Sequence, residues 1–407
     1  MLHSLKILFS GRMISAFLMG FSCGLPLLLT NTLLQAWMKE QGIDLTLIGM
    51  TALIGLPYTL KFLWAPLLDH FVLPFLGRRR GWLIIFQIAL LITISGLGVT
   101  NPKANLYLIT LIAFLVTFFS ASQDIIVDAY RRESLSDEEL GLGSSLYVNG
   151  YRLGMLLASG GGLILADIIS FRMVFVLLGQ TMLIGIITTI FCLEPNHAEG
   201  KPASLREAIF SPIAEYFNRE SAIWMLLFIL MYKLGDSMAS SITTPFYMDL
   251  GFTKTQIGAV VKLFGFWSTV FGTLTGGFLI LRIGINKSLW IFGFLQAIST
   301  LGFVFLAQMG NKIFALSLVI CSENFTAGMG TSAFTAFMAS ITNKRFTVTQ
   351  YALLSSLMGI PRVVISAPTG FLAKYLGWEG FFIFCTLIAI PGMLLLLKFA
   401  PWQSSKT

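Results

Sequence analysis

Charged side chains are scarce in this chain. They make up only 11% of its 407 residues, whereas hydrophobic residues make up 56%. Soluble globular domains carry about 25% charged residues. The mean hydropathy of +0.82 is also higher than an aqueous fold can accommodate in its core. These values exclude a soluble globular protein and indicate an integral membrane protein.

Histidine and cysteine are rare, with three and four residues. The histidines fall outside the apolar segments, and the cysteines are scattered singly, with neither metal-ligand spacing nor paired positions in outer loops. We therefore expect inert thiols, no metal and no cofactor. The chain has no Walker A loop, zinc-binding His-Glu-x-x-His motif or Gly-x-Ser-x-Gly elbow. A metalloenzyme is disfavoured, and ATP-driven transport would need another subunit.

Long apolar segments dominate the sequence. A membrane-spanning helix needs about 20 apolar residues, and twelve segments satisfy this requirement. They are residues 10–38, 46–68, 82–100, 105–128, 142–167, 171–193, 221–248, 255–281, 287–308, 312–341, 347–374 and 378–400. The first continues to Trp37 without a small-residue cleavage site, so we interpret it as a span and not as a signal peptide.

Basic residues alternate from one turn to the next. With both termini in the cytoplasm, the inner segments hold most of them, including Arg78, Arg79, Arg80, Arg131, Arg132, Arg206, Arg219, Arg282, Lys344 and Arg345. The outer turns hold only Lys39, Lys103, Arg172, Lys254, Lys312 and Lys374. This excess is what the positive-inside rule predicts. The net charge of +8 therefore reports topology, and we expect no nucleic-acid partner.

A polar, proline-containing stretch divides the chain. We predict a six-helix bundle at 1–193, a cytoplasmic linker at 194–220 and a second six-helix bundle with a short tail at 221–407. Collinear repeats support the division: Ile48-Gly49 recurs as Ile257-Gly258, and Ser144-Ser145-Leu146 recurs as Ser355-Ser356-Leu357. The predicted fold class is thus an all-α integral membrane protein with 12 transmembrane helices in two six-helix bundles, the major facilitator arrangement.

Apolar residues recur at helical spacing within the linker, at Leu205, Ala208, Ile209, Ile213 and Phe217. This periodicity predicts a short amphipathic helix on the inner membrane face. Its role is either to tether the two halves or to bind a regulatory partner.

Several ionisable residues lie inside predicted spans, where each needs a partner, a wet cavity or a function. Counting residues from the membrane faces places Asp124 near the depth of Arg152, and Glu323 near that of Arg362. Each acid is either a proton carrier or half of a permanent salt bridge. Asp128 precedes Arg131 by three residues, so we interpret it as an interfacial structural carboxylate.

Other polar residues admit two interpretations. Lys233 and Asp236 share a helix face near mid-membrane and would line a cavity or bias its gating, with Asp236 a third candidate proton carrier. Lys262 either faces an anionic substrate or snorkels to the outer surface. Trp267 either stacks on a sugar ring or packs against lipid and core. We expect Lys61 to be structural, reaching Asp69 or the inner face.

Several blocks carry more specific information: GLPYTLKFLWAPLLD at 55–69, LGRRRGW at 76–82, SASQDIIVDAY at 120–130, GYRLGMLLASGG at 150–161, and the region from Glu323 through GMGTSAF to Leu357. Together they resemble the AmpG anhydromuropeptide permeases of the major facilitator superfamily. The resemblance implies proton-driven import of N-acetylglucosaminyl-1,6-anhydro-N-acetylmuramyl saccharides and peptides from periplasm to cytoplasm, for cell-wall recycling. It implies a multi-pass protein of the bacterial inner membrane.

The resemblance also suggests roles for single residues. Gln123 and Asp124 stand at the Gln-Asp pair of the family, so Gln123 is a candidate sugar hydrogen-bond donor or a helix-packing amide, and Asp124 is the candidate coupling group. The chain departs from the usual facilitator Asp-x-x-Gly-Arg-Arg loop, because eight residues separate Asp69 from Arg78. We assign Asp69, Arg78 and Arg79 to structure or gating.

Three other functions remain open at this stage. An importer of a siderophore or another amphiphilic metabolite would share the fold. The basic set Arg152, Lys233, Lys262 and Arg362 suits an anionic cargo and disfavours a cationic one. A membrane-embedded sugar-modifying enzyme would need paired catalytic carboxylates, and a sensor would bind without accumulating its ligand. We expect a monomer that contacts protons, cargo and membrane lipid.

Overall fold

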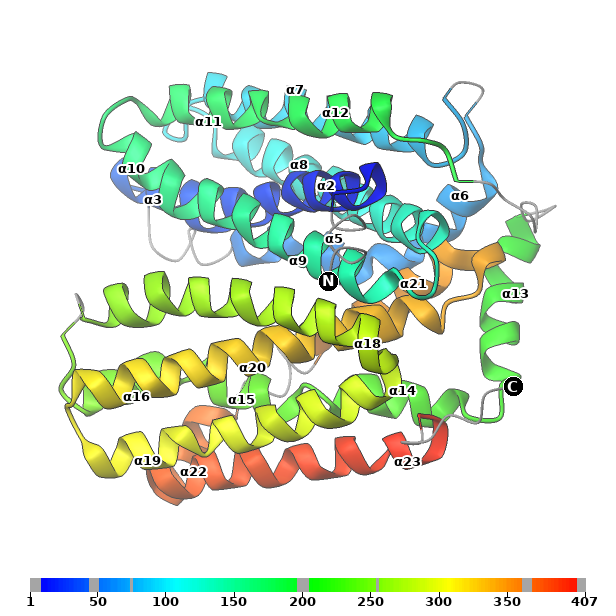
Figure 1. Cartoon of the computed structure of the whole chain (residues 1–407). Helices are drawn as coiled ribbons and strands as arrows, with labels where there is room; N and C mark the ends of the chain where they lie inside the picture. The colour runs from blue at the N-terminus through cyan, green and yellow to red at the C-terminus, as the bar shows by residue number, and fades with distance from the viewer. Residues whose placement is uncertain are drawn as a thin grey trace. The chain divides into compact units, whose positions relative to one another are not determined.

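The computed structural model describes residues 9–43, 51–73, 76–195, 205–253, 256–360 and 368–400. These residues form helices and connecting turns, without a strand among them (Figure 1). Eight helical segments in this part of the chain are long and apolar enough to cross a membrane. The composition-based prediction of an all-helical membrane protein is therefore confirmed.

The chain forms two compact units, and each takes a short segment from the other half of the sequence. The first unit comprises residues 1–136, 146–213 and 342–356, and the second comprises 137–145, 214–341 and 357–407. Two of the crossings fall in the repeated motif, between Ser145 and Leu146 and between Ser356 and Leu357. The repeat noted in the sequence thus coincides with the points where the chain passes between units.

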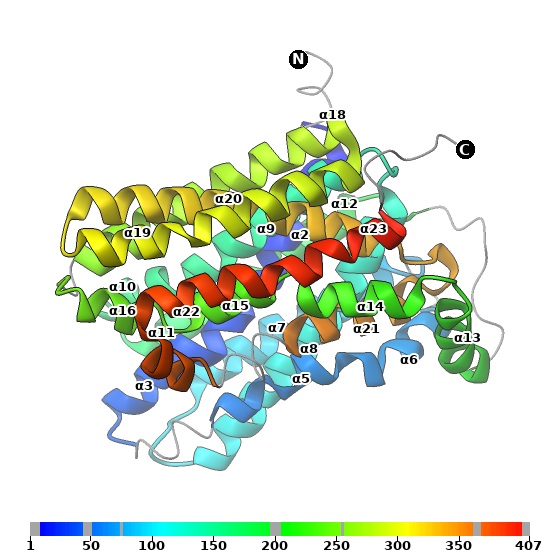
Figure 2. The same cartoon turned by 90° about the horizontal axis from the view of Figure 1, so that it is seen from below.

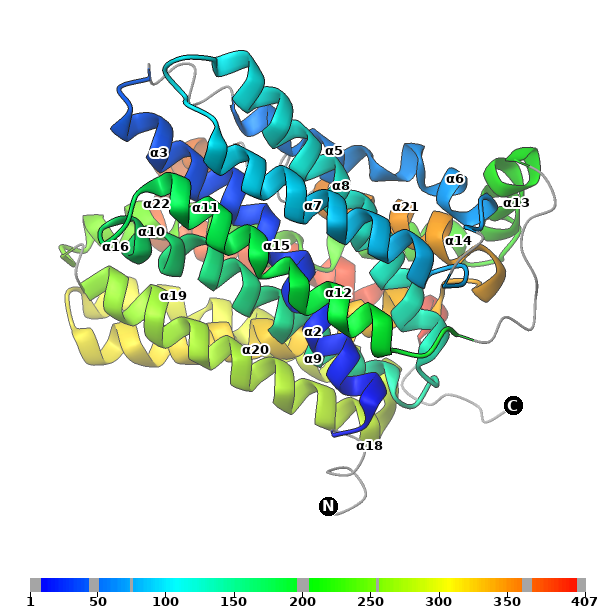
Figure 3. The ribbon, with the colours of Figure 1, turned by 90° about the horizontal axis from the view of Figure 1, so that it is seen from above.

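The first unit packs its long helices around apolar clusters, one that includes Leu25, Leu90 and Phe175 and another that includes Met19, Phe86 and Ile126. In Figure 3, α7 lies beside α8 on one side and beside α11 and α12 on the other, and α2 contacts α8 and α12. Its helices are α2 (Gly11–Leu28), η1 (Leu29–Leu33), α3 (Leu34–Glu40), η2 (Thr51–Gly55), α5 (Leu56–Leu60), η3 (Lys61–Leu63), α6 (Ala65–His70), α7 (Arg80–Val99), α8 (Leu106–Ser134), α9 (Leu140–Leu156, from residue 146), η4 (Leu157–Gly161), α10 (Gly162–Ala166), α11 (Phe171–Gln180) and α12 (Met182–Phe191).

The second apolar segment is not a continuous helix. It is broken into η2, α5, η3 and α6, with Pro57 and Pro66 in the first turns of α5 and α6. Proline has no backbone N–H and clashes with the preceding turn, so it is favoured at helix starts and breaks helix interiors. The breaks change the direction of the side chains between the two prolines, including that of Lys61.

Glycines let the helices of the first unit approach closely. A Cβ atom at Gly24 of α2 would lie 1.9 Å from the carbonyl oxygen of Tyr151 in α9, and one at Gly150 of α9 would lie 2.0 Å from that of Phe17. Such backbone-to-backbone contact is typical of small residues at membrane helix interfaces. The α2–α9 seam therefore depends on the absence of side chains.

The second unit contains the helices α14 (Ala222–Met231), α15 (Leu234–Ser241), α16 (Thr243–Asp249), η5 (Ile257–Phe264), α18 (Gly265–Thr300), α19 (Gly302–Met309), α20 (Ile313–Ser340), α22 (Thr369–Leu394) and α23 (Leu396–Phe399). Helix α20 packs along α18, and α22 packs against α14 and α15 (Figure 2). Gly284 in α18 and Gly377 in α22 have positive φ values of 80° and 69°, so the chain turns sharply at both. Glycine reaches this region without the Cβ penalty.

Two short helices, α13 and α21, contain points where the chain passes from one unit to the other. Helix α13 (Leu205–Phe217) forms in the linker, and its apolar side chains Phe210, Ile213 and Phe217 are exposed. Helix α21 (Thr347–Ile360) follows the 3₁₀ turn η6 (Lys344–Phe346). Both helices have residues in each unit.

Candidate functional site

Buried charges line one face of α8 in the first unit. Asp124 is only 5% exposed, Asp128 is also buried, and both interact electrostatically with Lys61, which is 7% exposed. Oδ1 of Asp124 has no hydrogen-bond partner in the described part of the chain. A buried carboxylate that is incompletely satisfied in a membrane span is the kind of group that binds a proton or a ligand.

Asp124 has partners that depth counting did not suggest. Lys61, Asp128 and Cys23 all interact with it, and its pairing with Arg152 stays a prediction. Lys61 does not reach Asp69, because η3 and Trp64 interrupt the helix between the two. Of the two alternatives for Lys61, Asp69 or the inner face, the contact with Asp69 is not made. The lysine interacts instead with the carboxylates of α8, and its structural role stays a prediction.

Gln123 lies beside Asp124 and is fully buried. Its Nε2 donates a hydrogen bond to Cys23 Sγ over 3.2 Å, while its Oε1 has no partner among the described residues. The contact with α2 fits the helix-packing interpretation, and the open oxygen leaves an acceptor for a ligand. The assignment of Gln123 to the cargo remains a prediction.

Two aromatic residues that the residue-level reasoning had not selected contact the same helix. Tyr58 Oη donates to Ser120 Oγ, and Trp64 Nε1 donates to Ser122 Oγ, each over 2.9 Å. Both lie in the GLPYTLKFLW block, so the resemblance contained the signal. Aromatic faces beside hydroxyl groups and carboxylates are suited to contact sugar rings.

Arg131 lies at the C-terminal end of this row of buried charges on α8. It is 1% exposed, donates to Asp128 Oδ1 over 3.1 Å and to Tyr351 Oη over 2.6 Å, and stacks 4.5 Å from the ring centre of Tyr147. A guanidinium in such surroundings is held by charge, hydrogen bonds and aromatic faces together. The structure thus joins α8, α9 and α21 through one side chain.

The loop between the second and third segments forms a separate ion network. Asp69 Oδ1 accepts from Arg78 over 3.0 Å and from Arg79 over 3.1 Å, and Arg79 also pairs with Glu133 over 2.6 Å. Burial alone would lower the pKa of Arg79, but the nearby Glu133 and Asp69 carboxylates outweigh it and hold that pKa above its ordinary value. The wider spacing of this loop still brings its acid and both arginines together.

Glu194 and Arg80 cap two neighbouring helices reciprocally. The Glu194 carboxylate accepts from the backbone N–H groups of Arg79 and Arg80, over 2.7 and 3.2 Å, at the start of α7. In return, Arg80 donates to the carbonyl oxygens of Thr189 and Ile190 at the end of α12. Anions at helix N-termini and cations at C-termini are both stabilising.

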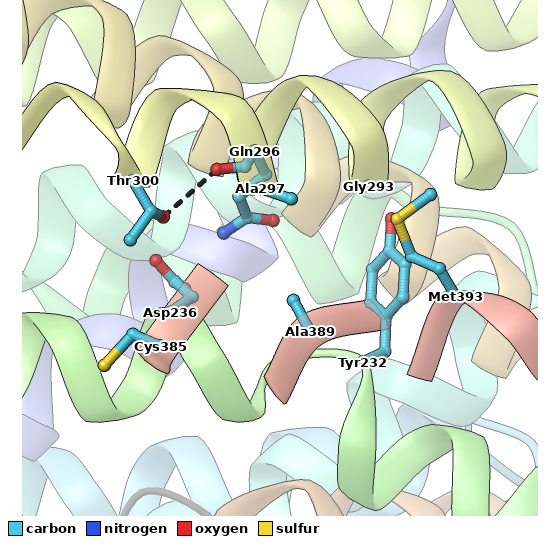
Figure 4. A pocket seen from close by; sticks show the side chains of 9 residues that line it. All are labelled: Tyr232, Asp236, Gly293, Gln296, Ala297, Thr300, Cys385, Ala389 and Met393. Atoms are coloured by element: carbon cyan, nitrogen blue, oxygen red, sulfur yellow. Dashed lines mark hydrogen bonds between the residues drawn. The ribbon is translucent and has the colours of Figure 1, made fainter. Parts of the chain in front are cut away.

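The second unit has its own buried polar cluster. Lys233 Nζ lies 3.5 Å from Asp236 Oδ2 and donates to Gln296 Oε1 over 3.2 Å. Glu323 on α20 is 8% exposed and accepts from the hydroxyl groups of Ser299 and Thr300 on α18. Figure 4 shows the small pocket beside this cluster, with Tyr232, Asp236, Gln296, Thr300 and Cys385 among the residues that line it.

The remaining predicted residues are more dispersed. Arg152 is half-buried on α9, Lys262 is exposed on η5, and Trp267 is 52% exposed on α18. Arg362 lies outside the described residues. The structure therefore brings Lys233, Asp236 and Glu323 together in the second unit and Gln123, Asp124, Asp128 and Lys61 in the first.

Comparison with known proteins identifies the family. The profile of the Major Facilitator Superfamily matches residues 13–366. The anhydromuropeptide permease of Escherichia coli strain K12 is 40% identical over 395 residues, which cover 97% of this chain and 80% of that protein. A putative transporter AmpG 4 of Rickettsia felis is 34% identical and covers 96% of this chain and 97% of its own length.

Solved structures agree on the fold. The crystal structure of the E. coli fucose:proton symporter superposes with a TM-score of 0.72 at 14% identity, covering 97% of this chain and 98% of that one. This level of identity supports the fold and nothing further. The chain is a multi-pass membrane transporter and not an enzyme, and it belongs to the anhydromuropeptide permease family of the Major Facilitator Superfamily.

Proposed function

We propose that this protein imports N-acetylglucosaminyl-1,6-anhydro-N-acetylmuramyl saccharides and muropeptides from the periplasm to the cytoplasm, driven by the proton gradient. The observation that carries this proposal is the 40% identity to the E. coli anhydromuropeptide permease across 97% of the chain. The buried carboxylates and basic side chains of both units suit a cargo that bears sugar rings and carboxylates. Transport would proceed by alternating access, as in other facilitators.

Twelve spans in two six-helix bundles are part of the proposal. The apolar segment Ile257–Met309 has 53 residues, and a continuous helix of that length would extend about 80 Å, against a hydrocarbon core of about 30 Å. The turn at Gly284 supports two crossings instead of one. The broken segment around Leu53–Leu63, residues 140–166, and the residues from α21 to Gly377 supply the remaining spans.

The same proposal includes topology and location. We assign residues 1–193 and 221–407 to the two bundles, the linker 194–220 and both termini to the cytoplasm, and the protein to the bacterial inner membrane as a monomer. The basic inner loops support this orientation, because Arg78, Arg79 and Arg131 would then lie at the cytoplasmic ends of their helices.

We assign proton coupling to Asp124 in the first unit and to Glu323 with Asp236 in the second. The burial of Asp124 and Glu323 within apolar helices supports this role, and Asp236 lies half-buried beside Lys233. Cargo binding is assigned to Gln123, Arg152, Lys233, Lys262, Trp267 and Arg362. Lys61, Asp69, Arg78, Arg79, Asp128 and Arg131 are assigned to structure or gating.

Uptake into proteoliposomes tests the function directly. Purified protein is reconstituted, and labelled N-acetylglucosaminyl-anhydromuramyl disaccharide and its tripeptide form are supplied with and without an inward proton gradient. Accumulation of chemically unchanged cargo only with the gradient is the expected result. Uptake of neither compound would reject the cargo and favour a siderophore or another metabolite, and binding without accumulation would indicate a sensor.

A further inference from the structure

The helix of the seventh apolar segment is interrupted near its middle. The break falls at Lys233, the only lysine in that segment. Helix α14 ends at Met231 and α15 begins at Leu234, and Lys233 has φ −100° and ψ 7°. Within a membrane, non-helical backbone is tolerated where it is buried in protein or lines a cavity. Broken helices of this kind contribute to substrate and ion sites in transporters.

A cavity lies against this break. It has a volume of about 10 Å³, the space of about one water molecule, and Tyr232 and Asp236 line it together with Gln296 and Thr300 (Figure 4). Gln296 is buried, and its Nε2 has no hydrogen-bond partner among the described residues. The cavity thus has both the space and a free donor for one water molecule.

Among the residues that the structure describes, charge is unbalanced around the cavity. Lys233 forms an ion pair with Asp236 and interacts electrostatically with Glu323. One ammonium group is therefore the counter-ion of two carboxylates. Helix α18 contributes only the uncharged groups of Gln296, Ser299 and Thr300, which contact Lys233 or Glu323. The other titratable groups that act on Glu323 among the described residues are Tyr247 of α16 and Cys385 of α22, and neither supplies a positive charge.

A buried and a half-buried carboxylate that share one counter-ion retain one proton, because a second uncompensated negative charge is costly in an apolar region. Glu323 is the more deeply buried of the two acids: its residue is 8% exposed, whereas the Asp236 side chain is 25% exposed. Hydroxyl groups surround Glu323 and can accept a hydrogen bond from its protonated form as well as donate to its ionised form.

We propose that Lys233, Asp236 and Glu323 form a one-proton site that controls binding of a cargo carboxylate by Lys233. With Glu323 protonated, Lys233 has one internal partner and binds the cargo. When the proton leaves by way of the Thr300 hydroxyl, which contacts Glu323 and lines the cavity, to water there, Glu323 competes for the lysine and the cargo is released. Only O–H bonds form and break in this step, those of Glu323, Thr300 and the water. The inference rests on the proposed function, because it requires a carboxylate-bearing cargo.

Binding measured against pH tests the site. Labelled anhydromuramyl tripeptide is titrated onto the full chain in detergent by thermophoresis, in an Asp124→Asn background that removes the other candidate proton group. One linked proton predicts that affinity falls with rising pH by up to about tenfold per pH unit. Glu323→Gln should retain the affinity seen at low pH and lose the pH dependence, and Asp236→Asn should also flatten it.

Lysine variants separate charge from structure. Lys233→Met should weaken binding of the tripeptide about tenfold or more at low pH while changing binding of its fully amidated form less than twofold, and Lys233→Arg should restore most of the affinity. Glu379→Gln is the matched control, because Glu379 is exposed on α22 away from the cluster. An unchanged pH dependence in Glu323→Gln, with normal size-exclusion behaviour, would overturn the proposal.

A spectroscopic measurement tests the proton site even if the cargo assignment is wrong. If the wild-type protein does not bind the tripeptide at any pH, the proposed function fails, and the proton site is then judged on cargo-free protein. Infrared difference spectra between low and high pH, recorded in the Asp124→Asn background, should contain the carbonyl band of a protonated carboxylic acid, and that band should be missing after Glu323→Gln but present after Glu379→Gln. A band that persists in Glu323→Gln would reject the site.

Discussion

Oδ2 of Asp69 accepts two hydrogen bonds from Thr349, one from its backbone N–H and one from its hydroxyl group, each over 3.0 Å and across 280 residues of sequence. Thr349 lies in the first turn of α21, where backbone N–H groups lack partners within the helix. The carboxylate therefore caps this helix while its other oxygen holds Arg78 and Arg79. One buried carboxylate therefore binds both the arginines of its own loop and the start of a helix that is distant in sequence.

Asp69→Asn should destabilise the protein by about 1–3 kcal/mol, because the amide keeps one acceptor but removes the charge that the arginines and the helix terminus require. The measurement is thermal unfolding of purified protein in detergent. Glu138→Gln, at an exposed position, should change stability by less than about 0.5 kcal/mol. Equal shifts for the two variants would mean that the network adds nothing.

Asp124→Asn should abolish accumulation of cargo against a gradient while leaving the protein folded and able to exchange internal for external cargo. The amide preserves size but cannot bind and release a proton. Proton-driven uptake and counterflow in proteoliposomes are the paired readouts, with Asp167→Asn on the exposed end of α10 as the control. Undiminished gradient-driven uptake by Asp124→Asn would reject this residue as the coupling group.

Gly24→Ala should destabilise the first unit by about 1–3 kcal/mol, because the new methyl group would meet the backbone of α9 and force the two helices apart. Gly96→Ala is the matched substitution, since nothing lies within 4 Å of a Cβ atom at that position in α7. Alanine there should be neutral or stabilising by up to about 1 kcal/mol. Unfolding midpoints of the two variants should therefore move in different directions.

Glu194→Ala should cost about 1–2 kcal/mol, the usual effect of losing a helix N-cap acceptor. The loss should decrease at high salt only slightly, since Glu194 is partly buried against α7. Unfolding at two ionic strengths measures both effects. Glu40→Ala, on an exposed helix end, provides the baseline, and a loss no larger than that baseline would contradict the capping role.

Much of the fold was accessible from the sequence because apolar length is a local property. Most apolar segments became helices close to the expected limits, for example Arg80–Val99 and Ile313–Ser340. The Lys233–Asp236 pair was also predictable, since three residues along one chain fix its geometry. The turn between the eighth and ninth segments was anticipated around residues 281–287, and Gly284 lies there.

The partners of the buried charges were harder to predict. Depth counting did not suggest Lys61 as a partner of Asp124, because depth does not determine the rotation of a helix about its axis and the sequence did not predict the break at η3. The interruption at Lys233 has no proline to mark it, and the nearest glycine, Gly235, lies inside α15. The contact between Asp69 and Thr349 joins residues whose separation no local pattern reports.

The exchange of short segments between the two units has a consequence for dissection of the protein. Residues 342–356 belong to the first unit, so a fragment ending in the linker would lack Thr349, the donor to Asp69, and Tyr351, the partner of Arg131. A second-half fragment would in turn lack residues 137–145 and the contact from Ser145 to the carbonyl oxygen of Thr273. Neither half of the gene therefore encodes a self-sufficient folding module, and split versions should regain structure only when both pieces are made together.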